Sequence, residues 1–323
     1  MIISKTPLRI SFVGGGTDLE AFYGKHGGAV VSTAIDKYIY VIIKKRFDRK
    51  IRVAYTRTEI VDSVDEIEHD LVREALRLTG ITHGVEIVTL ADIPSEGTGL
   101  GSSSSLTVGL LNAFYTFQGL SVGVHELAEQ ACHIEIDILG KPIGKQDQFI
   151  AAYGGIRYFQ FHTNGKTETQ LIRMGDADKE KLQNCLLLFY TGITRSSSTI
   201  LSEQKDKSIQ NTVHLLAMRD QCAMLMREFN EGNIQRLGEY LRNGWELKKK
   251  LANGITTSEV EKYYERACEA GAVGGKIAGA GGGGFLLLYV PIESQEKLRE
   301  TIPLQEMQFN FEKYGSRIVF NIE

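Results

Sequence analysis

The chain has 323 residues, a length that favours two domains over one, and its 42% hydrophobic and 24% charged residues are ordinary for a globular protein with large cores. The 37 Lys and Arg residues nearly balance the 40 Asp and Glu residues, so the net charge of -3 gives no electrostatic reason to expect nucleic acid as the main partner. The longest apolar runs have six residues, far fewer than the ~18 needed to span a bilayer.

The start of the chain and the cysteines point to the same compartment. The first residues, MIISKTPLRI, lack a charged leader followed by an apolar stretch and a cleavage site. The four cysteines lie far apart and form no CxxC pair, which argues against a zinc site. We therefore expect a cytoplasmic protein with reduced cysteines and no membrane segment.

Strand and helix patterns occur in both halves of the chain. In the first half, alternating apolar residues predict strands at 8–13, 38–43, 51–55, 85–90 and 156–161. Helices are predicted at 67–78, behind a capping box at 63–66, and at 106–117 and 125–139, with a short helical stretch opening at Thr17. The second half reads as a strand at 186–190, three helices ending near Gly271, a strand at 285–290, a short helix and a final strand at 317–322. This mixture indicates an α+β fold with two domains, which we divide into 1–185 and 186–323.

Glycine is concentrated in three places. It supplies 34 of 323 residues, about 10% against a norm of roughly 7%. Eight of these glycines lie within 271–284, and others form sets at 14–16 and 97–101. Clustered glycine between patterned segments indicates backbone that turns sharply or lies against a ligand.

The glycine run GAGGGG at 279–284 formally matches the dinucleotide fingerprint GxGxxG. That fingerprint requires a strand before the glycines and a helix after them. Here a helix is predicted before the run and a strand after it, so the dinucleotide interpretation fails. No GxxxxGK[ST] occurs either, which excludes the P-loop class. A glycine-rich packing turn is the weaker alternative to a binding loop.

The loop at 94–105, PSEGTGLGSSSS, stands between a predicted strand and a predicted helix. Its serines fall where the N–H groups of the helix N-terminus have no partner in the helix, and a phosphate there meets the positive end of the helix dipole. A serine hydroxyl in this place can also bind the Mg²⁺ that accompanies a nucleotide. A plain serine N-cap after a flexible turn is the alternative.

Three segments resemble the motifs of the GHMP small-molecule kinases, a family that includes galactokinase, homoserine kinase, mevalonate kinase and phosphomevalonate kinase. They are PLRISFVGGGTD at 7–18, PSEGTGLGSSSS at 94–105 and KIAGAGGGGF at 276–285, in the family's order and bracketing most of the chain. Within the family the sequence is most similar to the bacterial D-glycero-D-manno-heptose 7-phosphate kinases, with the fucokinases as near relatives. The resemblance implies an N-terminal domain like ribosomal protein S5 and a ferredoxin-like C-terminal domain, with ATP and sugar between them.

The resemblance also implies roles for single residues. Asp147 stands twelve residues after Glu135, the spacing of galactokinase-type members, and matches the catalytic aspartate; Arg9 matches the arginine of the first motif. Ser103 and Glu135 match the Mg²⁺ ligands. Galactokinases carry Glu-His where this chain has Gly15 and Gly16, which argues against galactose. The remaining expected contacts are Gly97, Gly99, Gly101, Ser102, Ser103 and Ser104 to the ATP phosphates, and Gly15, Gly16, Thr17, Asp18 and Gly281 to the sugar.

The chemistry explains these residue types. Transfer of the γ-phosphoryl group needs positioning, charge neutralisation and a group that takes the acceptor's proton. Asp147 can take that proton, while Arg9 can keep it ionised and stabilise the transferring phosphoryl. Singly, Asp147 and Asp18 could be helix caps, Glu135 a solvated helix residue and Arg9 a surface charge. As a set, they favour function.

Two basic residues are further candidates. His26 could line the sugar pocket, although a loop histidine is more often structural. Arg195, followed by three serines, is the candidate for a terminal phosphate of the sugar because guanidinium binds phosphate bidentately, with Lys5 and Lys25 as competitors. The lysine run at 248–250 is predicted to lie on a solvated face.

The expected function is ATP- and Mg²⁺-dependent phosphorylation of the anomeric hydroxyl of D-glycero-D-manno-heptose 7-phosphate to the 1,7-bisphosphate. This step would supply nucleotide-activated heptose for bacterial surface polysaccharide. The alternative within the same class is a fucokinase-like enzyme for an unphosphorylated sugar. The alternative from a different class is a sensor that binds ATP and sugar without turnover. The expected partners are the sugar phosphate and ATP, without nucleic acid or membrane; a homodimer is left open.

Overall fold

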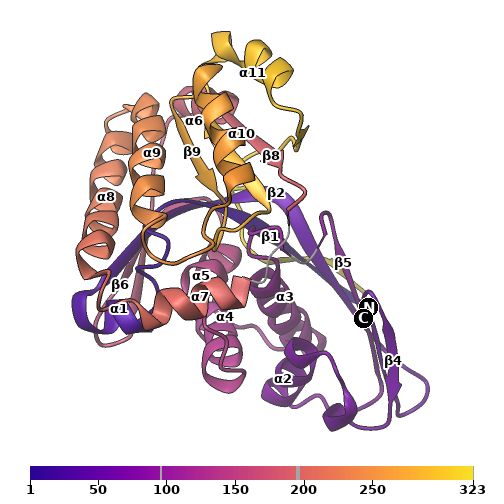
Figure 1. Cartoon of the computed structure of the whole chain (residues 1–323). Coiled ribbons are helices and arrows are strands. Elements are labelled where there is room, and N and C mark those ends of the chain that lie inside the picture. Colours follow the sequence, from indigo (N-terminus) through magenta and orange to yellow (C-terminus); the bar gives the residue numbers. More distant parts are fainter. Residues whose placement is uncertain (95–96, 194–196, 323) are drawn as a thin grey trace.

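The structure, a computed structural model, describes residues 1–94, 97–193 and 197–322 (Figure 1). Within these residues, eight strands form the first sheet, in the order β12-β1-β2-β5-β3-β4, and β6 and β7 extend it from one end of β2. The strands are β1 (Ile2–Val13), β2 (Gly28–Lys45), β3 (Ile51–Ala54), β4 (Thr58–Val61), β5 (Val85–Ala91), β6 (Ile156–Phe161), β7 (Thr167–Leu171) and β12 (Arg317–Asn321).

Helices cover both faces of the first sheet. On one face lie α2 (Asp70–Thr79), α3 (Ser102–Phe117), α4 (Val124–Cys132) and α5 (Gln146–Tyr153), and α3 packs directly on β1 and β2 (Figure 1). On the other face lie α8 (Thr212–Asn230) and α9 (Leu237–Lys248) from the second half; α8 packs on β1 and β2, and α9 packs on β1. Residues 6–13 of β1 are therefore all buried, including Arg9 and Ser11 on the side that the sequence predicted to be polar and half exposed.

The second sheet has the order β11-β8-β10-β9, with every pair antiparallel. Its strands are β8 (Leu186–Tyr190), β9 (Gly274–Ile277), β10 (Phe285–Tyr289) and β11 (Gln305–Glu306). Along the chain, helices α8, α9 and α10 (Ser258–Glu269) lie between β8 and β9, and α11 (Gln295–Thr301) lies between β10 and β11. This order and connectivity are those of a ferredoxin-like domain, so the predicted two-part α+β fold is confirmed.

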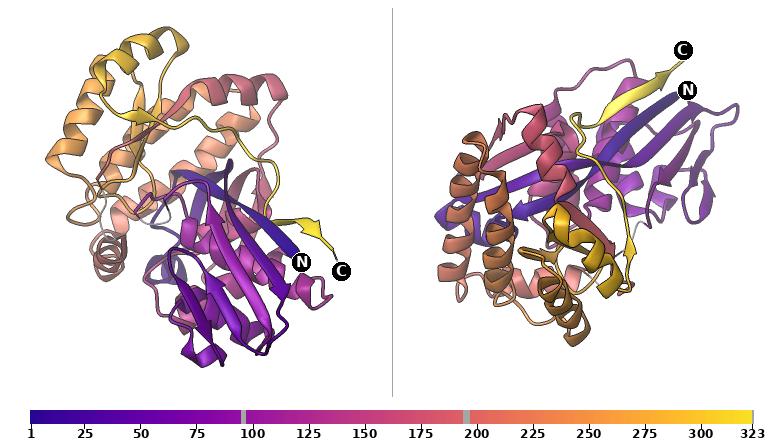
Figure 2. Two further views of the ribbon diagram at one scale, coloured as in Figure 1. Left: turned by 90° about the vertical axis from the view of Figure 1, so that its right-hand side faces the viewer. Right: turned by 90° about the horizontal axis from the view of Figure 1, so that it is seen from above.

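The two halves share a core and a chain end. One apolar cluster joins Leu8 and Ile10 of β1 to Leu225 of α8, Leu237 of α9 and Leu287 of β10. The last strand, β12, leaves the second half and pairs with β1, which brings the two termini together (Figure 2). The division at residue 185 remains a prediction, and β12, predicted as part of the second domain, lies in the first sheet.

Several predicted elements differ from the observed ones. The Ser63 hydroxyl donates to the Glu66 carboxylate at 2.7 Å and opens a 3-10 turn, Val64–Glu66, so α2 begins only at Asp70 and the helix predicted from residue 67 is wrong at its start. The predicted helix at 125–139 is α4 followed by a π-helical turn, His133–Ile138. The helices α1 (Glu20–His26), α6 (Asp176–Asn184) and α7 (Ser197–Asp206) complete the fold.

Candidate active site

Arg9 of β1 and Asp147 of α5 form a bidentate ion pair. Arg9 Nε donates to Asp147 Oδ1 and Nη2 donates to Oδ2, both at 2.7 Å, and Nη1 donates to the Gly99 carbonyl. The Arg9 side chain is 5% exposed and the Asp147 side chain 22%. Arg9 is therefore not a surface charge, and the paired guanidinium fixes the orientation of the Asp147 carboxylate.

The N-terminus of α3 opens onto a cavity of about 360 Å³. Gly101, at φ +79°, is the N-cap of α3, and within the described residues no side chain caps this end. The Ser102 hydroxyl is buried and has no hydrogen-bond partner among the residues that the structure describes. Uncapped N–H groups and an unpaired hydroxyl at a helix N-terminus suit an anion. We call this space the serine cavity; its lining includes Gly97, Gly99, Gly101, Ser102, Ser103, Ser104, Lys141, Asp147 and Gly281.

The loop that precedes α3, which we call the serine loop and which includes Gly97–Gly101, lies in backbone contact with the glycine run at 279–284. Gly99 has φ +73°, and a Cβ there would lie 2.4 Å from the Ala278 carbonyl oxygen; a Cβ on Gly279 would lie 2.7 Å from the Gly99 backbone. The helix predicted to end near Gly271 is α10, and a strand that was not predicted, β9, lies between it and the glycine run. The glycines form the turn of the β9–β10 hairpin, and the strand that follows still excludes a dinucleotide fold.

Ser103 and Glu135 meet at the edge of the serine cavity. The Ser103 hydroxyl donates to Glu135 Oε1 at 2.6 Å, and Gln148 Nε2 donates to Glu135 Oε2 at 2.7 Å. Glu135 lies in the π-helical turn and is fully buried, so it is not a solvated helix residue. Burial raises the pKa of Glu135, while hydrogen bonds from Ser103 and its neighbours oppose the rise. Hydroxyl and carboxylate oxygens are ligands that Mg²⁺ prefers.

Asp18 is held at the glycine turn. Its Oδ1 accepts from the Gly16 N–H at 2.9 Å, and its Oδ2 accepts from the Gln146 N–H, at the start of α5, at 3.3 Å. Burial raises the pKa of Asp18, and the Asp147 charge raises it further, against those backbone bonds. Thr17 was predicted to contact the sugar, but it is fully buried and its hydroxyl donates to the Ala29 carbonyl at 2.7 Å. This hydrogen bond stabilises the glycine turn.

A second cavity, the Asp18 cavity, adjoins the serine cavity. Its lining includes Arg9, Ser11, Gly15, Gly16, Asp18, Gln146, Asp147, Leu201 of α7 and Lys248. Arg9 and Asp147 line both cavities and therefore stand where the two meet. One site thus has an anion-binding half, a half with a buried carboxylate, and an ion pair between them.

Lys248, at the end of α9, was predicted to be solvated, and this prediction is wrong. The residue is only 4% exposed, and its Nζ donates to the Gly279 carbonyl. Burial lowers the pKa of Lys248 to about 8, although the charges of Asp18 and Asp147 oppose the shift. A signal was present in the sequence: Lys248 stands three residues after the buried Trp245 and so shares its helix face.

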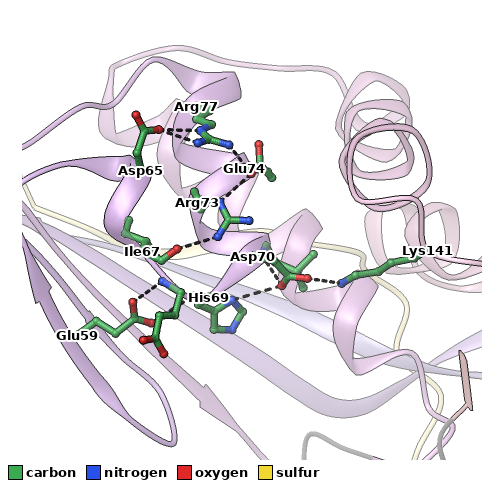
Figure 3. A network of polar contacts seen from close by, with 11 residues as sticks. Glu59, Asp65, Ile67, His69, Asp70, Arg73, Glu74, Arg77 and Lys141 are labelled. Atoms are coloured by element: carbon green, nitrogen blue, oxygen red, sulfur yellow. Dashed lines mark hydrogen bonds and ion pairs between the residues drawn. The ribbon is translucent and has the colours of Figure 1, made fainter.

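Lys141 is a second cation that the sequence analysis missed. It lines the serine cavity, and its Nζ lies 3.4 Å from Asp70 Oδ2 at the N-terminus of α2 (Figure 3). Beside it a hollow of about 750 Å³ contains Tyr55, His69 and Leu106 and reaches Ser102 and Ser103. Glu59 Oε1, which accepts from the His69 N–H at 3.3 Å, ties this wall to β4 (Figure 3). We call this space the Tyr55 hollow.

Comparison with known proteins agrees with this geometry. Residues 62–155 match the model of the GHMP kinases N terminal domain, and residues 225–303 match that of the GHMP kinases C terminal. A D-glycero-alpha-D-manno-heptose 7-phosphate kinase of Campylobacter jejuni is 30% identical over 97% of this chain and 97% of its own. The chain belongs to the GHMP kinases.

Other relatives of this GHMP kinase differ in their named substrates. An L-fucokinase/L-fucose-1-P guanylyltransferase of Bacteroides fragilis is 29% identical over 89% of this chain, which spans 34% of that protein. The crystal structure of a D-glycero-D-manno-heptose 1-phosphate kinase from Bacteroides thetaiotaomicron superposes with a TM-score of 0.82 at 26% identity over both whole chains. The Lactococcus lactis galactokinase structure, at 20% identity and a TM-score of 0.79, has the same fold.

Some residues predicted to contact the sugar of this GHMP kinase lie elsewhere. His26 lines a separate hollow with Tyr158 and Arg219, and does not line the Asp18 cavity. The ammonium of Lys5 stands 3.7 Å from the centre of the Tyr38 ring, also outside both cavities. Arg195 lies outside the described residues. Gly281 lines the serine cavity.

Two properties concern the described residues as a whole. They contain no group of three or more His, Cys, Asp or Glu side chains that could hold a metal ion. None of the helices traced in 1–94, 97–193 and 197–322 is both long and apolar enough to cross a bilayer.

Proposed function

We propose that this GHMP kinase transfers the γ-phosphoryl group of ATP to the anomeric hydroxyl of D-glycero-D-manno-heptose 7-phosphate, giving the 1,7-bisphosphate for nucleotide-activated heptose. The observation that carries the proposal is the Arg9–Asp147 ion pair, which lines both cavities. The Campylobacter relative, similar over nearly its full length, supports the choice of sugar.

ATP fits the serine cavity and the Tyr55 hollow together. The triphosphate would lie against the N-terminus of α3, with the unpaired Ser102 hydroxyl and Lys141 beside it. The nucleoside would enter the Tyr55 hollow, which adjoins Ser102 and Ser103 and contains aromatic and apolar side chains. In this orientation the γ-phosphate would point towards Arg9 and Asp147.

Mg²⁺ fits Ser103 and Glu135. The two side chains share one hydrogen bond at the cavity edge and offer hard oxygen ligands, and phosphate and water would complete the shell. When bound, the ion neutralises charge on the nucleotide phosphates. The absence of a larger acidic cluster among the described residues matches a metal that is bound with its nucleotide rather than in a protein cage.

The sugar would place its anomeric hydroxyl at Asp147 and extend into the Asp18 cavity, whose volume of about 60 Å³ holds part of the sugar. The hydroxyl proton passes to the Asp147 carboxylate, and the anomeric oxygen forms a bond to the γ-phosphorus. The bond between the γ-phosphorus and the oxygen that bridges it to the β-phosphate breaks, which releases ADP. Arg9 holds the Asp147 carboxylate in place through both of its oxygens and offers its charge to the transferring phosphoryl. Asp18 accepts hydrogen bonds from other hydroxyls of the sugar.

L-fucose is the second candidate substrate, because the Bacteroides fragilis protein is similar over most of this chain. A panel of sugars tests both candidates: ADP release from ATP is measured with heptose 7-phosphate, the same heptose without phosphate, L-fucose, D-galactose and mevalonate. We expect the highest kcat/KM with heptose 7-phosphate. A preference for L-fucose would make L-fucose the substrate in place of heptose 7-phosphate. ATP binding without sugar-dependent ADP release would favour a sensor.

A further inference from the structure

The wall of the Asp18 cavity contains a small polar recess formed by four residues from four elements. A Cβ placed on Gly15 would lie 3.6 Å from Lys248 Nζ, 3.7 Å from Gln146 Nε2 and 3.8 Å from Ser11 Oγ. Ser11 comes from β1, Gly15 from the glycine turn, Gln146 from α5 and Lys248 from α9. The missing side chain of residue 15 is therefore what keeps this space open; we call it the Gly15 recess.

The polar groups around the recess have hydrogen-bonding capacity that the described residues do not use. Ser11 Oγ and Gln146 Oε1 are buried and have no hydrogen-bond partner among the described residues, and Ser11 is 4% exposed. Lys248 Nζ carries up to three N–H donors, of which one is used by the Gly279 carbonyl. Buried polar groups are almost always paired in native proteins, so unpaired ones facing a cavity indicate a ligand.

The mixture of donors and acceptors selects the ligand's chemistry. Lysine and the Gln146 amide nitrogen donate, Gln146 Oε1 and the neighbouring Asp18 carboxylate accept, and a serine hydroxyl does both. A phosphate carries acceptors only and would be repelled by Asp18. Hydroxyl groups satisfy both kinds of partner, so the recess suits the polyol part of a sugar.

We propose that Ser11, Gln146 and Lys248, around the recess that Gly15 leaves open, bind ring hydroxyls of the sugar substrate and position its anomeric oxygen at Asp147. This inference rests on the proposed function, because it needs a sugar in the Asp18 cavity. It assigns Lys248 as a positioning residue, and it makes Gly15 a residue that determines which sugars fit.

Gly15 offers a selective test. Unlike Gly14 and Gly16, it does not have a positive φ, and an added Cβ would make only ordinary van der Waals contacts. Gly15→Ala should therefore fold normally and yet fill the recess. Gly123→Ala is the matched control, since Gly123 has φ -65° and, in the described structure, nothing lies within 4 Å of its added Cβ.

The experiment is steady-state kinetics with ATP and whichever of heptose 7-phosphate and L-fucose the wild-type enzyme turns over faster. Gly15→Ala, Ser11→Ala and Lys248→Met should each raise KM for the sugar about tenfold or more, which is about 1.4 kcal/mol, with KM for ATP and Tm close to wild type. The controls Gly123→Ala and Lys250→Met, the latter an exposed lysine just beyond Lys248, should match wild type.

The pH profile gives a second readout. Lys248 faces Arg9 of β1, Asp18 of the glycine turn, Asp147 of α5 and Lys276 of β9. Its ammonium form donates to the sugar and offsets the two carboxylates. Because its pKa is lowered to about 8, kcat/KM for the sugar should fall as the pH rises through about 8, and Lys248→Met should lose this limb.

The outcomes separate the inference from the proposed function. If the wild-type enzyme turns over neither sugar, the proposed function fails and the recess loses its ligand. Suppose that the wild-type enzyme turns one sugar over, but Gly15→Ala and Lys248→Met keep KM for that sugar within about twofold of wild type, or the alkaline limb persists in Lys248→Met. The proposed function then stands, and only the assignment of the recess to the sugar is overturned. A parallel loss of Tm and of ATP affinity would show a structural role instead and would also overturn it.

Discussion

Asp147 accepts from Arg9 through both carboxylate oxygens, so Asp147→Asn keeps the shape of the side chain but replaces one of these acceptors with an NH2 donor. Asp147→Asn removes the proton acceptor and should lower kcat by about 10²–10⁴-fold, while the affinities for ATP and sugar stay near wild type. Kinetics and calorimetric titration measure the two effects. Asp62→Asn, at an exposed surface pair, is the control. Near-normal turnover of Asp147→Asn would leave Asp147 a structural residue.

The Ser103–Glu135 pair makes a prediction about magnesium. Ser103→Ala and Glu135→Gln each remove one oxygen ligand, so the Mg²⁺ concentration needed for half-maximal activity should rise, and excess Mg²⁺ should restore part of the rate. Activity measured against Mg²⁺ concentration checks this. Unchanged Mg²⁺ curves in variants that lose activity but melt normally would exclude both residues as ligands.

At the scale of residues, the sequence predicted the centre of the site better than its walls. Arg9, Ser103, Glu135 and Asp147 belong to motifs whose order and spacing are visible along the chain, and the structure brings them together. Lys248 stands in a run of lysines, where solvation is the usual outcome. Its spacing of three residues from Trp245 places it on the buried face of α9, and this helical spacing was the better guide than the lysine run.

At the scale of elements, the contact between the serine loop and the β9–β10 turn joins the two halves at the site. Gly99→Ala places a Cβ 2.4 Å from the Ala278 carbonyl oxygen, so the two loops must separate. We expect a lower Tm and a clearly higher KM for ATP. Thermal melts and kinetics measure both.

Gly119→Ala is the matched control for Gly99→Ala. Gly119 has the same φ of +73°, but in the part of the chain that the structure describes nothing lies within 4 Å of its added Cβ. It therefore carries only the strain of a left-handed backbone, about 1–2 kcal/mol. Equal losses of Tm in the two variants, with KM for ATP unchanged, would show that the loop contact does not matter.

The elements that the sequence predicted best have strong local patterns, such as β6, β8 and β10. The strand β9 was missed because its four residues, GGKI, include two glycines and show no alternation. The capping box at Ser63 failed because its serine bonds the Glu66 side chain rather than a backbone N–H. The first error arises where strand pairing with β10 overrides a weak local signal, and the second where one local hydrogen bond forms in place of another.

At the scale of the whole molecule, the shared apolar cluster and the return of β12 to β1 connect the two halves. We expect one cooperative unfolding transition in scanning calorimetry, because neither half can lose its core alone. A chain ending at residue 185 would lack β12 and the helices that cover β1, and should not fold. Two resolved transitions, or a stable fragment 1–185, would contradict this.

Phosphorus NMR of a single reaction tests the central claim most directly. The enzyme is mixed with ATP, Mg²⁺ and D-glycero-D-manno-heptose 7-phosphate, and the products are followed over time. The proposed function predicts a new phosphate resonance, coupled to the anomeric proton, that grows in equal amount with ADP. Free phosphate alone, transfer to another oxygen of the sugar, or no transfer to this sugar would contradict it.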